Sequence, residues 1–159
     1  MWAVRYCPGV SMRYAAVLCL AVSVLSMAGC QQRAAPGGSL IAEDGGLRIT
    51  EHEVALTPAN VADVLASEKP VLVDFSAAWC GPCLALMPEV QTLAEERHGE
   101  LVVAIVDATD SSSSNQTLVD KFNVQGFPSL FVIKDQTVVG YSAGAPAGSL
   151  SDWVDAQLD

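Results

Sequence analysis

Residues 71–83 read VLVDFSAAWCGPC and join an apolar run to a segment that carries two cysteines. The first five residues are apolar apart from Asp74, a pattern typical of a strand that is buried on both faces of a sheet. Cys80 and Cys83 are three residues apart, and at the start of a helix this spacing places them on one face, close enough for a disulfide. The stretch therefore predicts a strand, a tight turn and a helix, with a cysteine pair at the turn.

On both sides of this stretch, strand patterns and helix patterns alternate along the chain. Two local signals mark helix starts: Thr57 followed by Pro58, and Ser149 followed three residues later by Asp152. The predicted elements, in chain order, are strand 53–56, a helix from Thr57, strand 71–75, helix 80–97, strand 101–107, a short helix near 118–122, strands 129–134 and 137–141, and a last helix from Ser149. This order predicts an α/β fold with a mixed central β-sheet flanked by helices on both faces.

The start of the predicted helix at residue 80 favours a reactive sulfur. Unpaired backbone N–H groups and the helix dipole stabilise a thiolate there, and a thiolate is the attacking species in disulfide exchange. This placement predicts Cys80 as the nucleophile. Cys83 lies one turn further into the helix, where it can resolve the mixed disulfide, and Pro82 restrains the turn between the two cysteines.

Two other uses of a cysteine pair compete with this interpretation. A zinc site needs two more ligands, and the two histidines, His52 and His98, do not form a ligand pair. A structural disulfide that closes so short a loop removes little chain entropy from the unfolded state. We therefore expect no metal, no other cofactor, and a disulfide whose role is chemical.

The motifs along the chain resemble those of the thioredoxin family. The resemblance rests on the strand at 71–75, the AWCGPC that follows at 78–83, Pro88, and the Gly-Phe-Pro at 126–128 before a strand. It covers roughly residues 50–159. It implies the thioredoxin fold and a thiol–disulfide oxidoreductase that acts on protein dithiols and disulfides through a Cys80–Cys83 disulfide.

The resemblance also implies roles for residues at matching positions. Asp74 would be a buried carboxylate beneath the disulfide, with a pKa raised by desolvation, so that it exchanges a proton with Cys83. Pro128 would follow a cis bond that lets the backbone at Phe127 pair with an extended substrate, and Gly144 would belong to the third loop of that surface. The implied catalytic residues are Cys80, Cys83 and Asp74, and the implied substrate-binding residues are Trp79, Gly81, Pro82, Phe127, Pro128 and Gly144.

Three positions depart from the family pattern. Ser76 stands where the family often has a second tryptophan, and Leu84 replaces the lysine or arginine that often follows the second cysteine. Ile105 occupies a strand position where cytoplasmic thioredoxins commonly carry a lysine near the buried aspartate. We expect the loss of that cation to leave Asp74 less willing to ionise.

A different pattern begins the chain. A basic residue, Arg13, precedes an apolar run at 14–28, which is shorter than the roughly 20 residues of a membrane-spanning helix. Small residues then lead directly into Cys30. This resembles a bacterial lipoprotein signal, in which the peptide is cut before the cysteine and the cysteine takes a lipid. The alternative is an ordinary secretory signal with a chance cysteine near its end.

These features divide the chain into three parts. We expect a lipoprotein signal peptide at 1–29, a lipid-anchored flexible linker at 30–46 and a thioredoxin-like domain at 47–159. The linker prediction rests on two glycine pairs and on Pro36, which interrupt any periodic pattern. An N-terminal strand that uses Leu40-Ile41 or Leu47-Arg48-Ile49 remains an alternative for part of it.

The net charge and the predicted location limit the partners that the protein can have. Eight Lys+Arg against 18 Asp+Glu give a net charge of −10, which argues against a nucleic-acid binder. The signal and the anchor imply an extracytoplasmic, periplasmic location, and Gln31 resembles the pattern of lipoproteins that are sent to the outer membrane. A reductant in an oxidising compartment needs electrons delivered through the membrane. We therefore expect a membrane thiol-electron donor as a partner, and a monomer.

The direction of electron flow is predicted from the residues between the cysteines. Gly81-Pro82 resembles reductant members of the family more than oxidants. The sequence thus predicts a tethered protein-disulfide reductase. Two alternatives stay open: an extracytoplasmic disulfide oxidase or isomerase, and a tethered peptide-binding (holdase) module without catalytic turnover.

Overall fold

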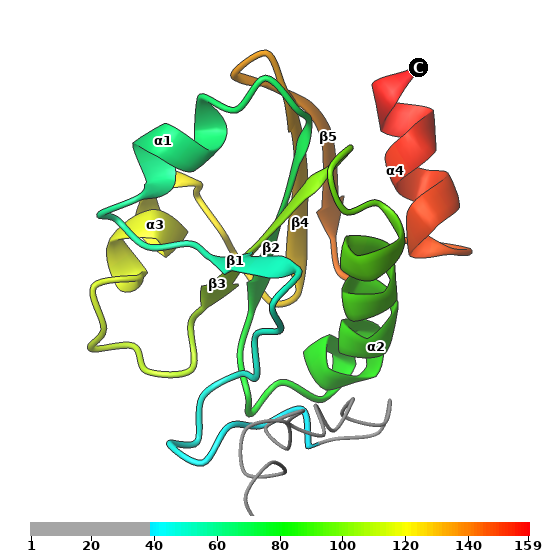
Figure 1. Ribbon diagram of the computed structural model, residues 1–159. Coiled ribbons are helices and arrows are strands. Elements are labelled where there is room, and N and C mark those ends of the chain that lie inside the picture. Colours follow the sequence, from blue (N-terminus) through cyan, green and yellow to red (C-terminus); the bar gives the residue numbers. More distant parts are fainter. Residues whose placement is uncertain (1–38) are drawn as a thin grey trace, which may run out of the picture. The chain divides into compact units, whose positions relative to one another are not determined.

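The structure, a computed structural model, describes residues 39–159. The predicted signal peptide, Cys30 and the first part of the predicted linker lie outside these residues. The elements are β1 (Glu53–Ala55), α1 (Val61–Leu65), β2 (Val71–Ser76), α2 (Gly81–Glu96), β3 (Val102–Asp107), α3 (Gln116–Lys121), β4 (Ser129–Lys134), β5 (Thr137–Ala143) and α4 (Leu150–Leu158), in the order that the sequence predicts (Figure 1). In this described part of the chain, no helix has both the length and the apolar character needed to cross a bilayer.

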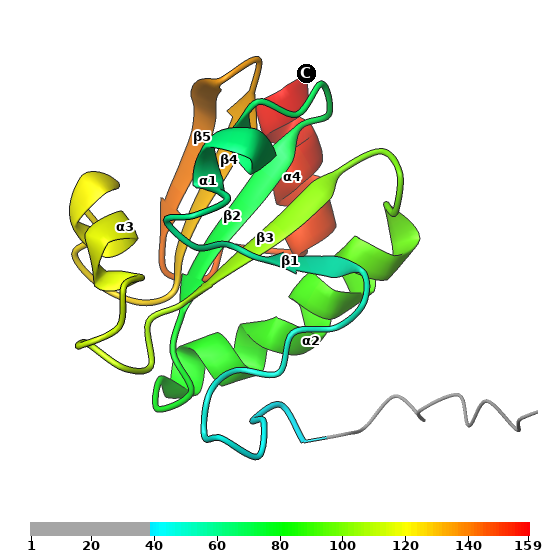
Figure 2. The same ribbon diagram turned by 60° about the vertical axis from the view of Figure 1, so that its left-hand side comes forward.

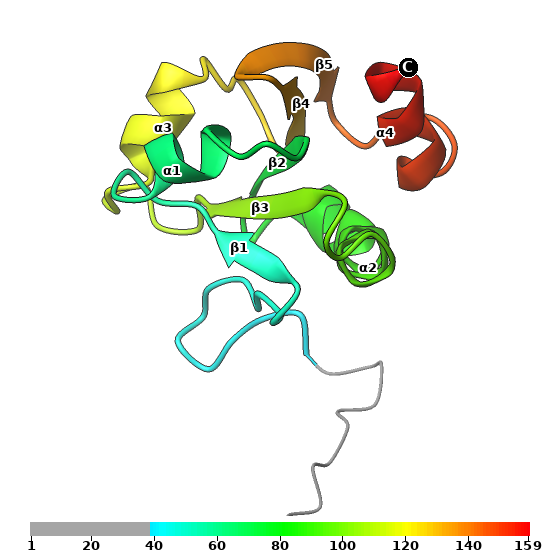
Figure 3. The same ribbon diagram turned by 45° about the horizontal axis from the view of Figure 1, so that its top comes forward.

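The strands form one five-stranded sheet in the order β1-β3-β2-β4-β5. Strands β1, β3 and β2 run parallel, whereas β4 is antiparallel to β2 and β5 is antiparallel to β4. Figure 3 shows helices α1 and α3 on one face of the sheet and helices α2 and α4 on the other. The predicted mixed sheet with helices on both faces is confirmed.

The central strand β2 is buried along its whole length, and its side chains alternate between two cores. Val71, Val73 and Phe75 belong to the core beneath α1 and α3, whereas Leu72 belongs to the core beneath α2 and α4. Because side chains alternate along a strand, Asp74 points to the same face as Leu72, toward α2. The fold therefore places one carboxyl group inside the core that supports the cysteine-bearing helix.

Helix α1 begins later than the sequence predicts. Thr57 and Pro58 form a turn instead of the N-cap and first helical residue, and the N-cap is Asn60. The Asn60 side chain explains the turn, since its Oδ1 accepts from the Thr57 backbone N at 2.8 Å and its Nδ2 donates to the Ala55 carbonyl at 2.9 Å. At α4 the predicted cap is present, because Ser149 Oγ accepts from the Asp152 backbone N at 3.1 Å.

The compact unit that holds the sheet begins at Ser39, within the predicted linker 30–46. Ile41 pairs with Leu47 in an antiparallel bridge, so the alternative of strand-like pairing applies to this part of the linker. Gly45 allows the turn between them because its φ is +83°, a conformation that side chains rarely adopt. The side chain of Leu47 is buried in the core beneath α2 and α4, which fastens the segment to the domain.

The central position of β2 predicts a large cost for truncating a side chain there. Leu72→Ala should lower the free energy of unfolding by about 3 kcal/mol, because Leu72 is fully buried and leaves a cavity. Urea unfolding of the oxidised protein measures the change. The matched control is Val138→Ala on the exposed edge strand β5, which should change stability by less than about 0.5 kcal/mol. Equal losses for both variants would contradict this account of the core.

Candidate active site

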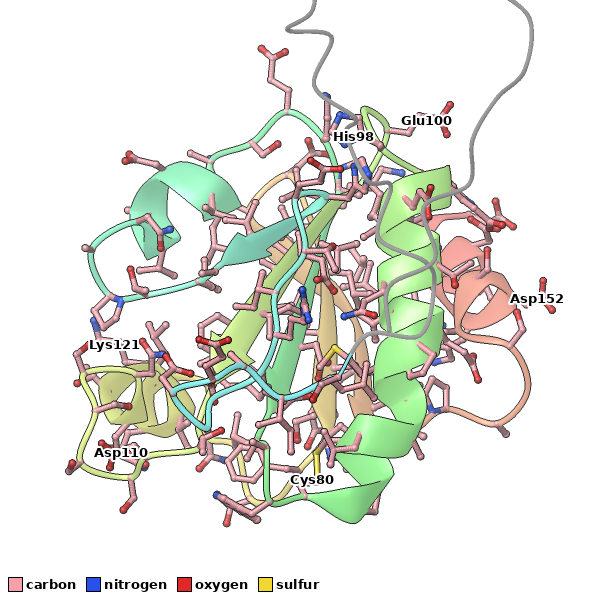
Figure 4. All side chains as sticks on the ribbon, turned by 60° about the horizontal axis from the view of Figure 1, so that its bottom comes forward. Cys80, His98, Glu100, Asp110, Lys121 and Asp152 are labelled. Atoms are coloured by element: carbon pink, nitrogen blue, oxygen red, sulfur yellow. A yellow bond between two sulfur atoms is a disulfide. The ribbon has the colours of Figure 1, made fainter. Side chains whose placement is uncertain are left out.

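A disulfide joins Cys80 and Cys83 at the N-terminal end of α2. The two Cα atoms are 5.3 Å apart. Both side chains are largely buried, and they pack against Ala77 and Phe127. Figure 4 shows Cys80 at the end of α2 that meets the chain leaving β2.

The local sequence explains how Cys80 is held. Cys80 is the N-cap of α2, and its Sγ accepts from the Cys83 backbone N at 3.3 Å, as an N-cap oxygen would. Pro82 suits the first helical turn because its missing N–H would have no partner there in any case. In the dithiol state, the remaining free N–H groups and the helix dipole favour a thiolate at Cys80 over one deeper in the helix.

Asp74 lies almost fully buried in β2, as the resemblance implied. Burial raises the pKa of Asp74 from 3.8 to about 7. The Ser76 hydroxyl, which donates to Asp74 Oδ1 at 2.7 Å, lowers the pKa in part, and the negative charge of Glu53 raises it. A carboxyl group with a pKa near neutrality can accept and return a proton at physiological pH.

The departures from the family pattern surround this carboxyl group. Ser76, in the place of a second tryptophan, is fully buried and supplies the hydrogen bond to Asp74. Ile105 lies beside Asp74 on the neighbouring strand β3, so an apolar side chain occupies the position where a lysine would offset the charge. Within residues 39–159, the second oxygen of Asp74, Oδ2, is buried and has no hydrogen-bond partner.

Glu53 is a site residue that the sequence analysis missed. It is buried in β1, where its Oε2 accepts from the Thr50 backbone N at 2.7 Å. Glu53 and Ala55 share one face of β1, and Ala55 lies level with Ile105 and Asp74 across the sheet. A glutamate inside a predicted strand was the available signal, but only the strand order brings it to the face that carries Asp74.

An aromatic rim lies beside the disulfide. Trp79 is 65% exposed, and its ring meets that of Phe127 edge-on, with the centroids 5.7 Å apart. The indole Nε1 of Trp79 donates to the Thr109 carbonyl at 3.0 Å, a contact that the sequence analysis did not find. Gly81 and Pro82 are exposed next to Trp79, so the predicted contact residues of this loop face solvent.

Two further loops meet this rim. The Phe127–Pro128 peptide bond is cis, as the resemblance implied. The carbonyl of Pro128 accepts from the Gly144 backbone N at 2.8 Å, and Gly144 has a φ of +94°. The structure thus brings together the predicted residues from the loop before α2, the loop before β4 and the loop after β5.

The described residues 39–159 contain no cluster of three or more His, Cys, Asp or Glu side chains placed to hold a metal ion. The rings of His52 and His98 do meet edge-on, with their centroids 5.2 Å apart. They lie on the lead-in to β1 and after α2, and no third ligand joins them in the described part of the chain. The polar chemistry at the end of β2 is that of two sulfurs and a carboxyl group.

Comparisons with known proteins agree with this geometry. The sequence model of the thioredoxin family matches residues 52–156. Thioredoxin C-2 of Corynebacterium nephridii is 41% identical over 98 residues, which cover 61% of this chain and 87% of that protein. Thioredoxin of Pseudomonas aeruginosa is 36% identical over 112 residues, which cover 69% of this chain and 100% of that protein.

A solved structure gives the same result. Thioredoxin f from spinach chloroplast superimposes with a TM-score of 0.58 at 27% identity, over 68% of this chain and 88% of that one. The chain therefore belongs to the thioredoxin family and has the thioredoxin fold. It is a thiol–disulfide oxidoreductase with a Cys80–Cys83 disulfide.

The raised pKa of Asp74 predicts a specific dependence of stability on pH. The folded protein keeps the Asp74 proton up to a pH of about 7, whereas the unfolded chain loses it near 3.8. Between these values the folded state binds more protons, so its stability falls as the pH rises, by up to about 4 kcal/mol. Asp74→Asn removes this fall. The free energy of unfolding of the variant minus that of the wild type should therefore be larger at pH 8 than at pH 4. Urea unfolding of the oxidised proteins measures this difference.

A companion variant tests the cause. Ser76→Ala removes the hydrogen bond that lowers the pKa of Asp74, so the fall in stability should extend to higher pH than in the wild type. A stability difference between wild type and Asp74→Asn that is the same at pH 4 and pH 8 would contradict the raised pKa.

Proposed function

We propose that this protein reduces protein disulfides outside the cytoplasm. The Cys80 thiolate attacks one sulfur of the substrate disulfide, forming a mixed disulfide and releasing the other sulfur as a thiolate that takes a proton from solvent. Cys83 then gives its proton to the Asp74 carboxylate and attacks Cys80 Sγ. The second substrate sulfur leaves Cys80 as a thiolate and takes a proton from solvent. The substrate then carries two thiols and the enzyme carries the Cys80–Cys83 disulfide, so two electrons have passed to the substrate.

The observation that carries this cycle is the pairing of a helix-capping cysteine with a buried, near-neutral carboxyl group. Cys80 caps α2, which favours its thiolate, while Cys83 is fully buried one turn further in. Asp74 points to the face of the sheet that α2 covers, and its pKa of about 7 suits the proton that Cys83 must lose. Each cysteine therefore has an environment matched to one of the two steps.

The reducing direction is supported by the lack of a cation next to the second cysteine. Leu84 follows Cys83, so no lysine or arginine stands at that position. The end of α2 and the Cys83 backbone N–H then favour the Cys80 thiolate without the further help of a neighbouring positive charge. The dithiol is stabilised less than it would be beside a cation, which makes it a better electron donor.

The substrate surface in this proposal is the rim around the disulfide. Trp79, Gly81 and Pro82 present the loop before α2, and Phe127–Pro128 and Gly144 present the loops on either side of the β4–β5 hairpin. In this proposal the Phe127 backbone pairs with an extended substrate segment next to Cys80. An unfolded or flexible segment that carries a disulfide fits this surface.

The location rests on the N-terminal sequence. We propose that a lipid on Cys30 anchors the protein on the periplasmic side of a bacterial membrane, with the outer membrane favoured by Gln31. The compact unit that holds the domain starts at Ser39, within the predicted linker 30–46 that would join it to the lipid on Cys30. A membrane protein that passes electrons between thiols would return the oxidised site to the dithiol, since the compartment itself is oxidising.

Activity and redox potential test the reaction. The protein should reduce the disulfides of insulin with dithiothreitol as electron source, and Cys80→Ser should abolish this reduction. Cys83→Ser should instead accumulate mixed disulfides with its substrates on Cys80, visible as adducts on non-reducing gels. Titration of the Cys80–Cys83 couple against glutathione should give a reducing potential. The titration is sensitive, because a difference of about 30 mV in potential changes the free energy of this exchange equilibrium by ~1.4 kcal/mol.

Two results would overturn the proposed function. A strongly oxidising potential would replace the reductase by an oxidase or isomerase. Insulin reduction unaffected by Cys80→Ser, together with peptide binding, would favour the tethered holdase.

Mass spectrometry of the mature protein tests the anchor. Expressed in full in a bacterium with an outer membrane, the chain should start at Cys30, and that residue should carry the mass of a lipid. Cys30→Ala should leave the protein unprocessed or soluble, because cleavage of this type of signal requires the cysteine. A soluble wild-type protein with an unmodified Cys30 would refute lipidation.

A further inference from the structure

A threonine outside the active-site loop holds that loop at two points. Thr109 Oγ1 accepts from the Ala78 backbone N at 2.8 Å, and the Thr109 carbonyl accepts from Trp79 Nε1 at 3.0 Å. Ala78 is buried, so its N–H has no water to replace this partner. Thr109 follows β3 and lies 30 residues or more from both groups in the sequence.

An aspartate connects this threonine to the N-terminal segment. Asp107 Oδ1 accepts from the Thr109 backbone N at 2.9 Å. The other oxygen, Asp107 Oδ2, accepts from the Leu47 backbone N at 2.8 Å, across 60 residues of sequence. One carboxylate therefore binds both Thr109, which supports the active-site loop, and Leu47, which belongs to the N-terminal segment 39–49.

Residues 39–49 are attached to the domain beside the site. Figures 1 and 2 show this segment at the same end of the domain as the start of α2. Its apolar attachments are the buried Leu47 and the half-buried Leu40 and Ile49, which pack against the core beneath α2 and α4. Its hydrogen bonds to the rest of the domain include the one from the Leu47 backbone N to Asp107 and one from Gln91 Nε2 to the Arg48 carbonyl at 3.3 Å. At Gly46 the backbone passes so close that an added Cβ would lie 2.7 Å from Asp107 Oδ2.

We propose that Asp107 and Thr109 are positioning residues that couple the N-terminal segment to the loop carrying Trp79 and Cys80. Thr109 sets the place of Ala78 and of the Trp79 ring, and Asp107 fixes Thr109 only while Leu47 holds its second oxygen. Detachment of residues 39–49 therefore loosens the rim on which substrate docks. This inference rests on the proposed function for its kinetic readout, but not for its spectroscopic one.

The coupling depends on one carboxylate, that of Asp107, whose two oxygens accept from different segments of the chain. A carboxylate that accepts two fixed backbone N–H groups is held in one rotamer. If Leu47 moves away, the Asp107 side chain loses one of its two donors, and the remaining bond to the Thr109 backbone N, which orders the turn after β3, is held less firmly. In this way residues 39–49 influence the site through hydrogen bonds and not through contact with substrate.

The first experiment tests Thr109. The full chain is labelled with 5-fluorotryptophan, and the ¹⁹F signal of Trp79 is assigned with Trp79→Phe. Thr109→Val should shift this signal and raise KM for insulin roughly fivefold with kcat little changed, as expected for the loss of one hydrogen bond. Thr109→Ser, which keeps the hydroxyl, should restore both. A Trp79 signal and a KM that Thr109→Val leaves unchanged would overturn the proposal.

The second experiment tests the coupling. Gly46→Ala pushes a methyl group against Asp107 Oδ2 and should shift the Trp79 signal in the same direction as Thr109→Val. The same substitution should have no further effect on that signal when Asp107→Ala is already present. The matched control is Asp63→Ala, which removes the same charge from an exposed residue of α1 and should leave Trp79 unaffected.

The outcomes separate this inference from the proposed function. If Gly46→Ala lowers stability but leaves the Trp79 signal and KM unchanged, the segment is only a structural attachment and the coupling is wrong. If the wild type reduces no insulin, the proposed function fails. The ¹⁹F shifts still decide the coupling in that case, because they require no turnover.

Discussion

The burial of β2 on both faces is the constraint on which the site depends. A central strand covered by helices has no water to solvate a carboxylate, so Asp74 holds its proton up to a pH of about 7. The same strand ends where α2 begins, and the N-terminal end of α2 carries Cys80. One piece of backbone thus supplies both a proton acceptor in an apolar core and a sulfur at the positive end of a helix dipole. These two environments differ sharply although only five residues separate them.

The rest of the site lies in loops at the end of the sheet where β2 ends. The turn after β3 supplies Thr109, the loop before β4 supplies the cis-proline, and the loop after β5 supplies Gly144. Each of the contacts between these loops uses at least one backbone group: Gly144 N with the Pro128 carbonyl, Trp79 Nε1 with the Thr109 carbonyl, and Ala78 N with Thr109 Oγ1. The strands bring the loops to one place, and these hydrogen bonds then fix their relative positions.

The departures from the family pattern act mainly on the proton. Ser76 gives Asp74 a hydrogen-bond donor, while Ile105 leaves it without a nearby cation and Glu53 adds a second negative charge on the same face. These influences oppose one another, and desolvation is the largest of them. The cysteine pair is therefore typical of the family, whereas the charges and hydrogen bonds around Asp74 differ from the family pattern.

The order of elements, the cysteine pair at a helix start and the buried aspartate could be predicted from the amino acids alone, because each leaves a local signal: a period, a spacing or an apolar run. The start of α1 was predicted too early, because the Asn60 side chain competes for the turn. For residues 39–46 the sequence left a linker and a short strand open, and the structure shows a paired segment there. That Glu53 lies on the same face as Asp74, that Thr109 holds Trp79 and that Asp107 holds Leu47 follows only from the three-dimensional arrangement. Such contacts join residues far apart in the chain through single polar atoms, and they depend on strand order and register, which no local pattern encodes.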